Sequence, residues 1–336
     1  MTTDRPVPEA AGKHWPQGLL RTAAKGLRRG TGVGEHVRTL ALPGRALRVA
    51  VRRGSPEWPP LLLCNGIGAR LELLQPFVDA LDRRRGVIRF DVPGIGGSPP
   101  PVVPYHLWTL APMLGDLLDQ LGYQQADVLG VSWGGGLAQQ FALRQPARVR
   151  RLVLVSTGTG ALMVPGHPRV LRHMLTPRRH LDPEYAARIA GEMYGGSAGV
   201  DPSRTRELLR STTDLGPGRG YYYQLLAAAG WTSLPLLPRL RTPTLILAGD
   251  GDPLTPVANA RIMHRLIPRS ELNIYHGGHL DLVSEPKRMA AIVEEFLDAK
   301  TDTGTGTANA AGPPARPSSW KAAQDRWRKA RQNARR

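Results

Sequence analysis

The stretch DVLGVSWGGGLAQQFAL, residues 127–143, joins an apolar run to a segment with helical spacing through a glycine-rich turn that contains Ser132. The glycines in Gly130-Val131-Ser132-Trp133-Gly134 permit a strand-to-helix turn too sharp for larger side chains, and this turn raises the serine above a sheet edge. A helix that begins there directs its positive end toward an adjacent oxyanion. The alternative is a glycine turn of a nucleotide-binding fold, but this strand is not the first and no phosphate-binding lysine pattern follows. The stretch therefore predicts a serine nucleophile.

The same strand-then-helix arrangement recurs along the chain. Apolar or alternating segments predict strands, and the segment 134–146 predicts a helix that ends at Pro146. This alternation predicts an α/β fold, in which a mostly parallel sheet carries helices on both faces. The expected strands are 45–54, 59–66, 86–98, 126–132, 148–158, 242–253 and 270–279.

Residues 160–235 interrupt this rhythm, since they contain no clear strand and are rich in Pro, Gly, Arg and Tyr. Ligands of such sheets bind beyond the carboxyl ends of the strands, so an insertion here predicts a cap over the site. We expect one domain over 34–299, flanked by a basic extension at 1–33 and by a linker with a basic tail at 300–336.

The composition predicts a protein of the cell interior. Of the 336 residues, 41% are apolar, and no apolar run reaches the length of a membrane-spanning helix. The N-terminus lacks the apolar core of a secretory signal, and a single cysteine, Cys64, excludes an internal disulfide. These features predict a cytoplasmic location.

The net charge of +18 predicts attraction to an acidic partner, such as nucleic acid or a negatively charged particle surface. The alternative is a general enrichment in arginine, which is spread along the whole chain. Trp320 and Trp327 lie one heptad apart in the basic tail, which predicts either an interfacial or partner-binding helix or a solvated tail.

A serine hydroxyl needs a base, and the base needs an acid to orient it. In a fold of this kind the chain order is serine, acid, histidine, each after a strand. His279 follows Gly277-Gly278 and is the preferred base over His276. Asp252 is the preferred acid, with Asp250 and Asp281 as alternatives.

The oxyanion of a tetrahedral intermediate needs N–H donors. The backbone N–H of Trp133 is one candidate, and the N–H of Ile67, in the loop after the strand 59–66, is the second. The Asn65 side chain either contributes directly or organises that loop. The pair His276 and His279 has metal-ligand spacing but no third ligand nearby, so we expect no metal.

With these residues assembled, the chain resembles the α/β-hydrolase superfamily and, within it, the intracellular poly(3-hydroxyalkanoate) depolymerases that act on medium-chain-length polyester. The resemblance covers about residues 36–298. It depends on the Val-Ser-Trp turn, the Asn-Gly-Ile-Gly loop and a tyrosine-rich cap segment, in stretches that include PPLLLCNGIGARLELLQPFVDALD, IRFDVPGIGGSPPPVVPY, GYYYQLLAAAGWTSLP and PTLILAGDGDPLTP.

The resemblance implies the catalytic residues Ser132, Asp252 and His279, a granule-bound polyester as the substrate, association with those granules, and 3-hydroxy acids or short oligomers as products. No metal or organic cofactor is expected. An insoluble chain needs an apolar route, and cap residues such as Leu226 and Trp231 either line it or form the cap's own core.

Two other functions stay open at this point. An esterase or thioesterase for small soluble substrates would use the same triad, and a granule- or nucleoid-binding protein would carry a vestigial one. The related polyester synthases use a cysteine nucleophile, so Ser132 favours hydrolysis.

Overall fold

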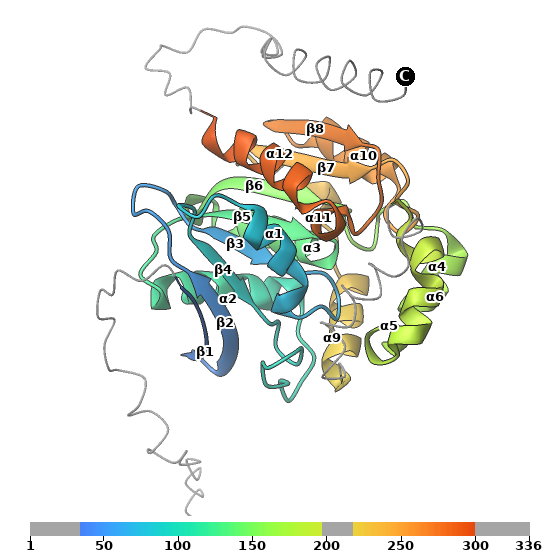
Figure 1. The fold of residues 1–336 in the computed structure, drawn as a ribbon, viewed down its shortest axis with the longest axis horizontal. Helices are drawn as coiled ribbons and strands as arrows, with labels where there is room; N and C mark the ends of the chain where they lie inside the picture. Colours follow the sequence, from blue (N-terminus) through green and yellow to red (C-terminus); the bar gives the residue numbers. More distant parts are fainter. Residues whose placement is uncertain (1–33, 197–217, 300–336) are drawn as a thin grey trace, which may run out of the picture. The chain divides into compact units, whose positions relative to one another are not determined.

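The computed structural model describes residues 34–196 and 218–299. The extensions 1–33 and 300–336, with Trp320 and Trp327, lie outside the described residues, as does the segment 197–217 of the expected cap. The described chain forms an eight-stranded sheet in the order β1-β2-β4-β3-β5-β6-β7-β8 (Figure 1). The strands are β1 (Glu35–Leu42), β2 (Arg45–Arg52), β3 (Leu61–Cys64), β4 (Val87–Phe90), β5 (Ala126–Val131), β6 (Val149–Val155), β7 (Thr244–Gly249) and β8 (Ser270–Tyr275).

The sheet is mostly parallel, which confirms the predicted α/β fold. Strands β4, β3, β5, β6, β7 and β8 pair in parallel, whereas β1 pairs with β2, and β2 with β4, in antiparallel fashion. In the centre, Cys64 of β3 lies opposite Gly130 of β5, and Val131 lies opposite Val155 of β6. This register brings the loops after β3, β5 and β6 together at the carboxyl edge of the sheet.

Strand β1 was not predicted from the sequence. It lies at the edge of the sheet and pairs with β2 alone, from Glu35 opposite Arg52 to Leu42 opposite Arg45. Most of its residues are exposed, with Leu40 and Leu42 as the buried ones. An exposed edge strand lacks the apolar alternation that marks a strand in sequence, so backbone pairing and not side-chain patterning defines it.

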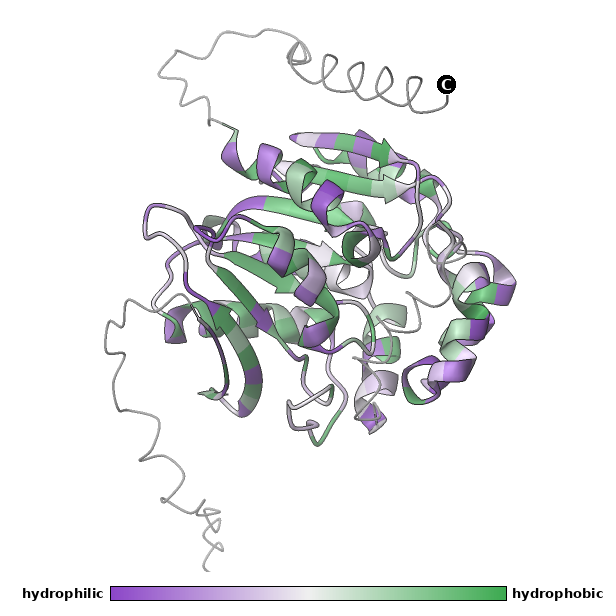
Figure 2. Cartoon of the chain, in the orientation of Figure 1, coloured by the Kyte–Doolittle hydropathy of each residue, from purple (hydrophilic) through white to green (hydrophobic). Residues whose placement is uncertain are grey.

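Helices cover both faces of the sheet, and the side chains of successive residues in a strand point to opposite faces. In β3, Leu62 packs into the core cluster that holds α2, α3 and α10, whereas Leu63 packs into the cluster that holds α1, α11 and α12. The strands are accordingly mostly apolar, whereas the covering helices carry both apolar and polar residues (Figure 2). These helices are α1 (Gln75–Ala80), α2 (Leu107–Gln120), α3 (Trp133–Arg144), α10 (Val257–Leu266), α11 (Asp281–Ser284) and α12 (Pro286–Asp298). The short 3-10 helix η1 (Leu71–Leu74) precedes α1, and the short 3-10 helix η2 (Pro146–Arg148) follows α3.

Between β6 and β7 the described chain is helical. An isolated antiparallel β-bridge pairs Gly160 with Thr232. The start and the end of the insertion therefore lie next to each other. Helices α4 and α6 share a small apolar cluster that includes Val170, Ile189 and Met193 and that also takes in Leu254 from the loop after β7. The elements of this cap are α4 (Pro168–Met174), α5 (Arg178–Leu181), α6 (Pro183–Tyr194), α9 (Gly218–Ala229) and the 3-10 helix η3 (Leu234–Arg239).

Candidate functional site

Ser132 occupies a strained turn between β5 and α3. Its backbone adopts φ 54° and ψ −122°, in a region that residues other than glycine rarely adopt. A Cβ on Gly130 would lie 2.4 Å from the Gly134 carbonyl oxygen, and a Cβ on Gly134 would lie 2.1 Å from the Cys64 carbonyl oxygen. The Thr157 hydroxyl donates a hydrogen bond of 2.7 Å to the Ser132 carbonyl. The turn therefore requires both glycines, and it leaves Ser132 on the wall of a cavity.

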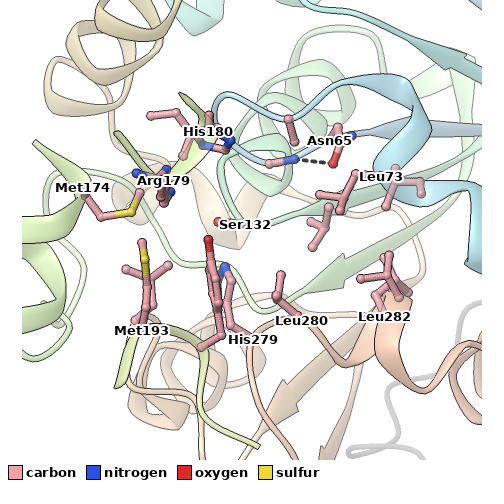
Figure 3. A pocket seen from close by; sticks show the side chains of 18 residues that line it. Asn65, Leu73, Ser132, Met174, Arg179, His180, Met193, His279, Leu280 and Leu282 are labelled. Atoms are coloured by element: carbon pink, nitrogen blue, oxygen red, sulfur yellow. Dashed lines mark hydrogen bonds between the residues drawn. The ribbon is translucent and has the colours of Figure 1, made fainter. Parts of the chain in front are cut away.

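Two aspartate–histidine pairs follow β7 and β8, and they differ in burial. Nδ1 of His279 lies 2.7 Å from Oδ2 of Asp252, and these side chains are 5% and 1% exposed. Nδ1 of His276 lies 3.2 Å from Oδ2 of Asp250, and these side chains are 71% and 49% exposed. His279 lines the same cavity as Ser132 (Figure 3). The structure thus brings Ser132, His279 and Asp252 together and leaves the second pair at the surface.

The Asp252 carboxylate is fixed on both of its oxygens. Oδ1 accepts hydrogen bonds of 2.9 Å from the backbone N–H groups of Leu254 and Thr255, while Oδ2 contacts the His279 ring. A carboxylate on Nδ1 keeps that nitrogen protonated, so Nε2 is free to accept a proton. Ser132 and His279 both line the cavity, and in the part of the chain that the structure describes no hydrogen bond joins the Ser132 hydroxyl to the imidazole.

The loop that carries His279 is held from two sides. The N–H of His279 donates a hydrogen bond of 2.7 Å to the carbonyl of Tyr194, at the end of α6. The phenol ring of Tyr194 also stacks on the imidazole ring of His279, with the ring centroids 6.2 Å apart. Asp281, the third candidate acid, accepts from the N–H of Gly278 at 3.1 Å and from Arg288 at 2.7 Å. Asp281 therefore shapes the histidine loop and does not contact the imidazole in any described hydrogen bond.

Asn65 organises the loop after β3. Its Oδ1 accepts a hydrogen bond of 2.8 Å from the N–H of Gly66, and its Nδ2 donates one of 2.6 Å to the Arg70 carbonyl. The loop passes close to the nucleophile, because a Cβ on Gly66 would lie 3.6 Å from the Cβ of Ser132. In the described part of the chain, no backbone hydrogen bond takes up the N–H of Ile67, which is the condition that an oxyanion donor requires.

Gln224, on α9 of the cap, connects both regions from which oxyanion donors were predicted. Its Oε1 accepts a hydrogen bond of 2.7 Å from the N–H of Gly68, and its backbone carbonyl accepts one of 2.8 Å from Nε1 of Trp133. The side chain of Gln224 is fully buried. Gln224 lies in the tyrosine-rich cap segment that carries the resemblance, but its role was not predicted, because it depends on contacts with residues 91 and 156 positions away.

The cavity is mainly apolar. Beside Ser132 and His279, two charged or titratable side chains from α5, Arg179 and His180, reach its wall, and neither was predicted from the sequence (Figure 3). Its apolar lining includes Leu73, Leu74, Met174, Met193, Leu280 and Val283. An acyl chain would therefore meet an apolar surface next to the nucleophile.

Burial controls the titration of several groups around the cavity. Burial, together with the positive charge of Arg179, lowers the pKa of His180 well below its usual value, so its imidazole is neutral at pH 7. Arg179 donates a hydrogen bond of 2.6 Å to the Tyr221 hydroxyl and lies over that ring. Burial also raises the pKa of the Tyr194 hydroxyl and of the Cys64 thiol, which keeps both protonated.

Asn65, Leu226 and Trp231, the residues that the sequence offered as candidates for contact with substrate, lie in different surroundings in the structure. Asn65 lines the cavity, but Trp231 and Leu226 do not. Trp231 is 5% exposed in the large core cluster, where Nε1 donates a hydrogen bond of 2.7 Å to Gln140. Leu226 is 56% exposed on α9. Leu237, a further leucine of the cap, is fully buried in the same cluster as Trp231.

The spacing of His276 and His279 does not produce a metal cluster, since each ring contacts a different aspartate. Within residues 34–196 and 218–299, no three His, Cys, Asp or Glu side chains gather in a way that could hold a metal ion. No helix in those ranges combines the length and apolar character that crossing a membrane requires.

The chain is similar in sequence and in fold to known hydrolases. Residues 59–286 match the family model of the alpha/beta hydrolase fold. A poly(3-hydroxyalkanoate) depolymerase of Ectopseudomonas oleovorans is 48% identical over 260 residues, which cover 77% of this chain and 92% of the relative. Among solved structures, a hydrolase from Pseudomonas aeruginosa PA01 is 28% identical with a TM-score of 0.68, over 79% of this chain and 99% of the other.

An enol-lactonase from Burkholderia xenovorans LB400 shares the fold with a TM-score of 0.67 at 22% identity, over 77% of this chain and 99% of the other.

Proposed function

The chain belongs to the alpha/beta hydrolase family and is an ester hydrolase, and from this premise we propose that it depolymerises poly(3-hydroxyalkanoate) with medium-length side chains through Ser132, His279 and Asp252. The observation that carries the substrate is the 48% identity to the depolymerase of Ectopseudomonas oleovorans, which extends over 92% of that relative. The apolar wall beside Ser132 supports the choice, because each repeat of such a polyester carries an alkyl side chain next to the ester.

Acylation begins with the hydroxyl of Ser132. Its oxygen attacks an ester carbonyl of the polymer while Nε2 of His279 takes the hydroxyl proton, and Asp252 stabilises the imidazolium that forms. The N–H groups of Ile67 and Trp133 would bind the developing oxyanion, and each such donor typically contributes roughly 10²–10³ in rate. The tetrahedral intermediate then breaks its C–O bond to the leaving chain, and the imidazolium returns its proton to that oxygen.

Deacylation repeats these steps with water. Nε2 of His279 removes a proton from the water, whose oxygen attacks the acyl carbonyl. The second tetrahedral intermediate then breaks its C–O bond to Ser132, the imidazolium returns its proton to the serine oxygen, and a 3-hydroxyalkanoic acid is released. Both half-reactions are proton transfers and acyl transfers, so the residues named are sufficient for the chemistry.

We also propose that the enzyme acts at the surface of polyester granules and that the basic extensions contribute an anionic contact, with nucleic acid or with a granule protein. The water-insolubility of the polymer that the 48% identical relative depolymerises supports the first statement, and the net charge of +18 supports the second. Co-sedimentation of the full chain with granules, at increasing salt and with or without added DNA, tests both.

Hydroxy acid release from two polyester suspensions tests the proposed substrate. The full chain and Ser132→Ala are compared on poly(3-hydroxyoctanoate) and poly(3-hydroxybutyrate), with p-nitrophenyl octanoate as a soluble ester. We expect the unmodified chain to degrade the octanoate polymer and to spare the butyrate polymer, and Ser132→Ala to cleave neither polymer nor soluble ester.

Cleavage of the soluble ester without degradation of either polymer would refute the polymer substrate and leave an esterase for small molecules. Full activity in Ser132→Ala would refute the nucleophile. Equal degradation of both polymers would refute the preference for medium-length side chains.

A further inference from the structure

Arg179, on α5 of the cap, places a buried positive charge at the wall of the cavity. The residue is 3% exposed and lines the cavity together with Ser132 and His279 (Figure 3). Unlike Nε2 of His180, which is closed off from solvent, no nitrogen of Arg179 is both sealed and without a partner. Because Arg179 borders this cavity, the guanidinium donors that the protein leaves unused are open to it.

The neighbours of this charge are neutral groups. Nη1 donates a hydrogen bond of 2.6 Å to the Tyr221 hydroxyl and a longer one of 3.4 Å to the His173 carbonyl. The guanidinium also lies over the Tyr221 ring, with its central carbon 5.2 Å from the ring centroid. Within residues 34–196 and 218–299, no Asp or Glu side chain forms an ion pair with it. A buried charge without a counter-ion is costly, so an anionic ligand would be bound favourably.

The rest of the cavity wall limits which anion fits. Among the lining residues that the structure describes, Arg179 alone carries a permanent charge, and burial keeps His180 neutral at pH 7. Leu73, Met193 and Leu280 are part of the apolar lining. One guanidinium matches one carboxylate through two parallel N–H···O bonds, whereas a dianion such as phosphate would keep an uncompensated charge against the apolar wall. The site therefore fits a carboxylate attached to an alkyl chain.

Tyr194 connects Arg179 with the catalytic histidine. Burial raises the pKa of the Tyr194 hydroxyl and the positive charge of Arg179 acts against that rise, so the guanidinium lies close to the hydroxyl. The Tyr194 ring stacks on the imidazole of His279. In the proposed mechanism His279 protonates the oxygen of the leaving alcohol, so the leaving half of the substrate lies beside this imidazole. In a dimer of 3-hydroxy acids, that half carries the free carboxylate, three bonds from the leaving oxygen.

We propose that Arg179 binds the free carboxylate of short hydroxyacyl oligomers, so that the enzyme hydrolyses these oligomers in preference to neutral esters of the same size. The inference rests on the proposed function for the roles of Ser132 and His279. In the dimer of 3-hydroxyoctanoate, the acyl carbon forms a bond to Ser132 and loses its bond to the leaving oxygen, which takes the serine proton from His279. Water then replaces Ser132, so one dimer and one water give two 3-hydroxyoctanoate ions and one proton.

The dimer and its primary amide form a matched pair of soluble substrates, because they differ in the charge of the end group. Initial rates of ester cleavage on both are measured by chromatography for the unmodified chain, Arg179→Gln and Arg179→Lys. We expect the unmodified chain to prefer the carboxylate dimer by about 10- to 100-fold in kcat/KM. The preference should fall to near unity in Arg179→Gln, whereas Arg179→Lys, which keeps the charge but not the planar fork, should retain at least about threefold.

Arg178→Gln is the matched control, because it makes the same change at the neighbouring residue, whose side chain is 58% exposed and pairs with Asp182. It should leave the preference for the carboxylate dimer unchanged. Because the preference is a ratio of rates on two substrates, a general loss of folded protein in a variant cancels. Equal rates of the unmodified chain on dimer and amide, or a full preference in Arg179→Gln, would overturn the inference.

Further measurements separate the oligomer from the released acid and this inference from the proposed function. Suppose that 3-hydroxyoctanoate inhibits the cleavage of p-nitrophenyl octanoate, that Arg179→Gln relieves the inhibition, and that the dimer is not preferred. This result would assign Arg179 to the released acid and overturn oligomer selectivity. Degradation of poly(3-hydroxyoctanoate) with equal rates on dimer and amide would refute the inference and leave the depolymerase assignment standing. Preferential cleavage of the dimer without degradation of the polymer would refute the depolymerase assignment and leave carboxylate recognition standing.

Discussion

Replacing Asp252 by asparagine should lower kcat by about 10⁴-fold with little change in stability. The amide oxygen can keep the two hydrogen bonds that Oδ1 accepts from the N–H groups of Leu254 and Thr255, so the amide nitrogen must then face Nδ1 of His279. A donor at that position forces the ring proton onto Nε2, which then cannot accept the proton of Ser132. The loss of 10⁴ in rate corresponds to about 5 kcal/mol of transition-state stabilisation.

The amide cannot escape this arrangement at low cost by turning over. The flipped amide would direct its NH₂ group at the N–H groups of Leu254 and Thr255 and leave two buried donors without acceptors. Each unsatisfied donor costs roughly 1–3 kcal/mol, so the flip costs about 2–6 kcal/mol. Both conformations of the variant are therefore impaired by several kcal/mol.

Initial rates on p-nitrophenyl octanoate, with a thermal melt of each variant, measure the effect. Asp250→Asn is the matched control, because it makes the same chemical change in the exposed pair with His276. We expect Asp250→Asn to keep kcat within about twofold of the unmodified chain. A kcat for Asp252→Asn above a tenth of the unmodified value, or an equal loss in both variants, would refute the assignment of Asp252 as the partner of the catalytic base.

Three further changes test the structure around the site. Gly134→Ala should destabilise the fold by at least about 2 kcal/mol or prevent folding, because the added Cβ meets backbone oxygen at 2.1 Å; an unaltered denaturant midpoint would contradict this. The Cys64 thiol should resist Ellman's reagent at pH 8 until the protein unfolds, since burial raises its pKa. Because the unfolded thiol ionises above about pH 8.5 and the folded one does not, the free energy of unfolding should fall by about 1.4 kcal/mol per pH unit there, a contribution that Cys64→Ala removes. Gln224→Leu should lower kcat about 10-fold because the N–H of Gly68 loses its acceptor, and Gln224→Glu, which keeps an acceptor, should restore most of the rate; an unchanged kcat in Gln224→Leu would show that this hydrogen bond does not position the loop.

The choice between two nearby aspartates illustrates the limit of the sequence. Asp250 and Asp252 both follow β7, and His276 and His279 both follow β8, so their spacing permits more than one pairing. The turn after β7 leaves Asp250 at the surface and directs Asp252 inward, where the N–H groups of Leu254 and Thr255 fix it. Burial, which depends on the cap and on neighbouring loops, separates the two pairs.

The cap residues at the site were beyond prediction for a related reason. His180 and Arg179 lie outside every quoted motif, and the tyrosine-rich segment that contains Gln224 does not show which loop this side chain contacts. All three reach the site because the insertion folds back over the carboxyl edge of the sheet. Trp231 shows the converse, since its apolar side chain was compatible with either a substrate wall or a core position, and packing against α3 buries it in the core. Neither outcome follows from residue type, because each depends on contacts between segments far apart in the chain.

The sequence by itself determined the strand-turn-helix around Ser132 and the parallel α/β order, because glycine sterics and apolar periodicity act over a few neighbouring residues. The tertiary structure alone decided which acid contacts His279, which cap side chains reach the cavity and how β1 joins the sheet. These features depend on packing and on backbone pairing between distant segments, and local patterns contain no information about which distant partner each segment meets.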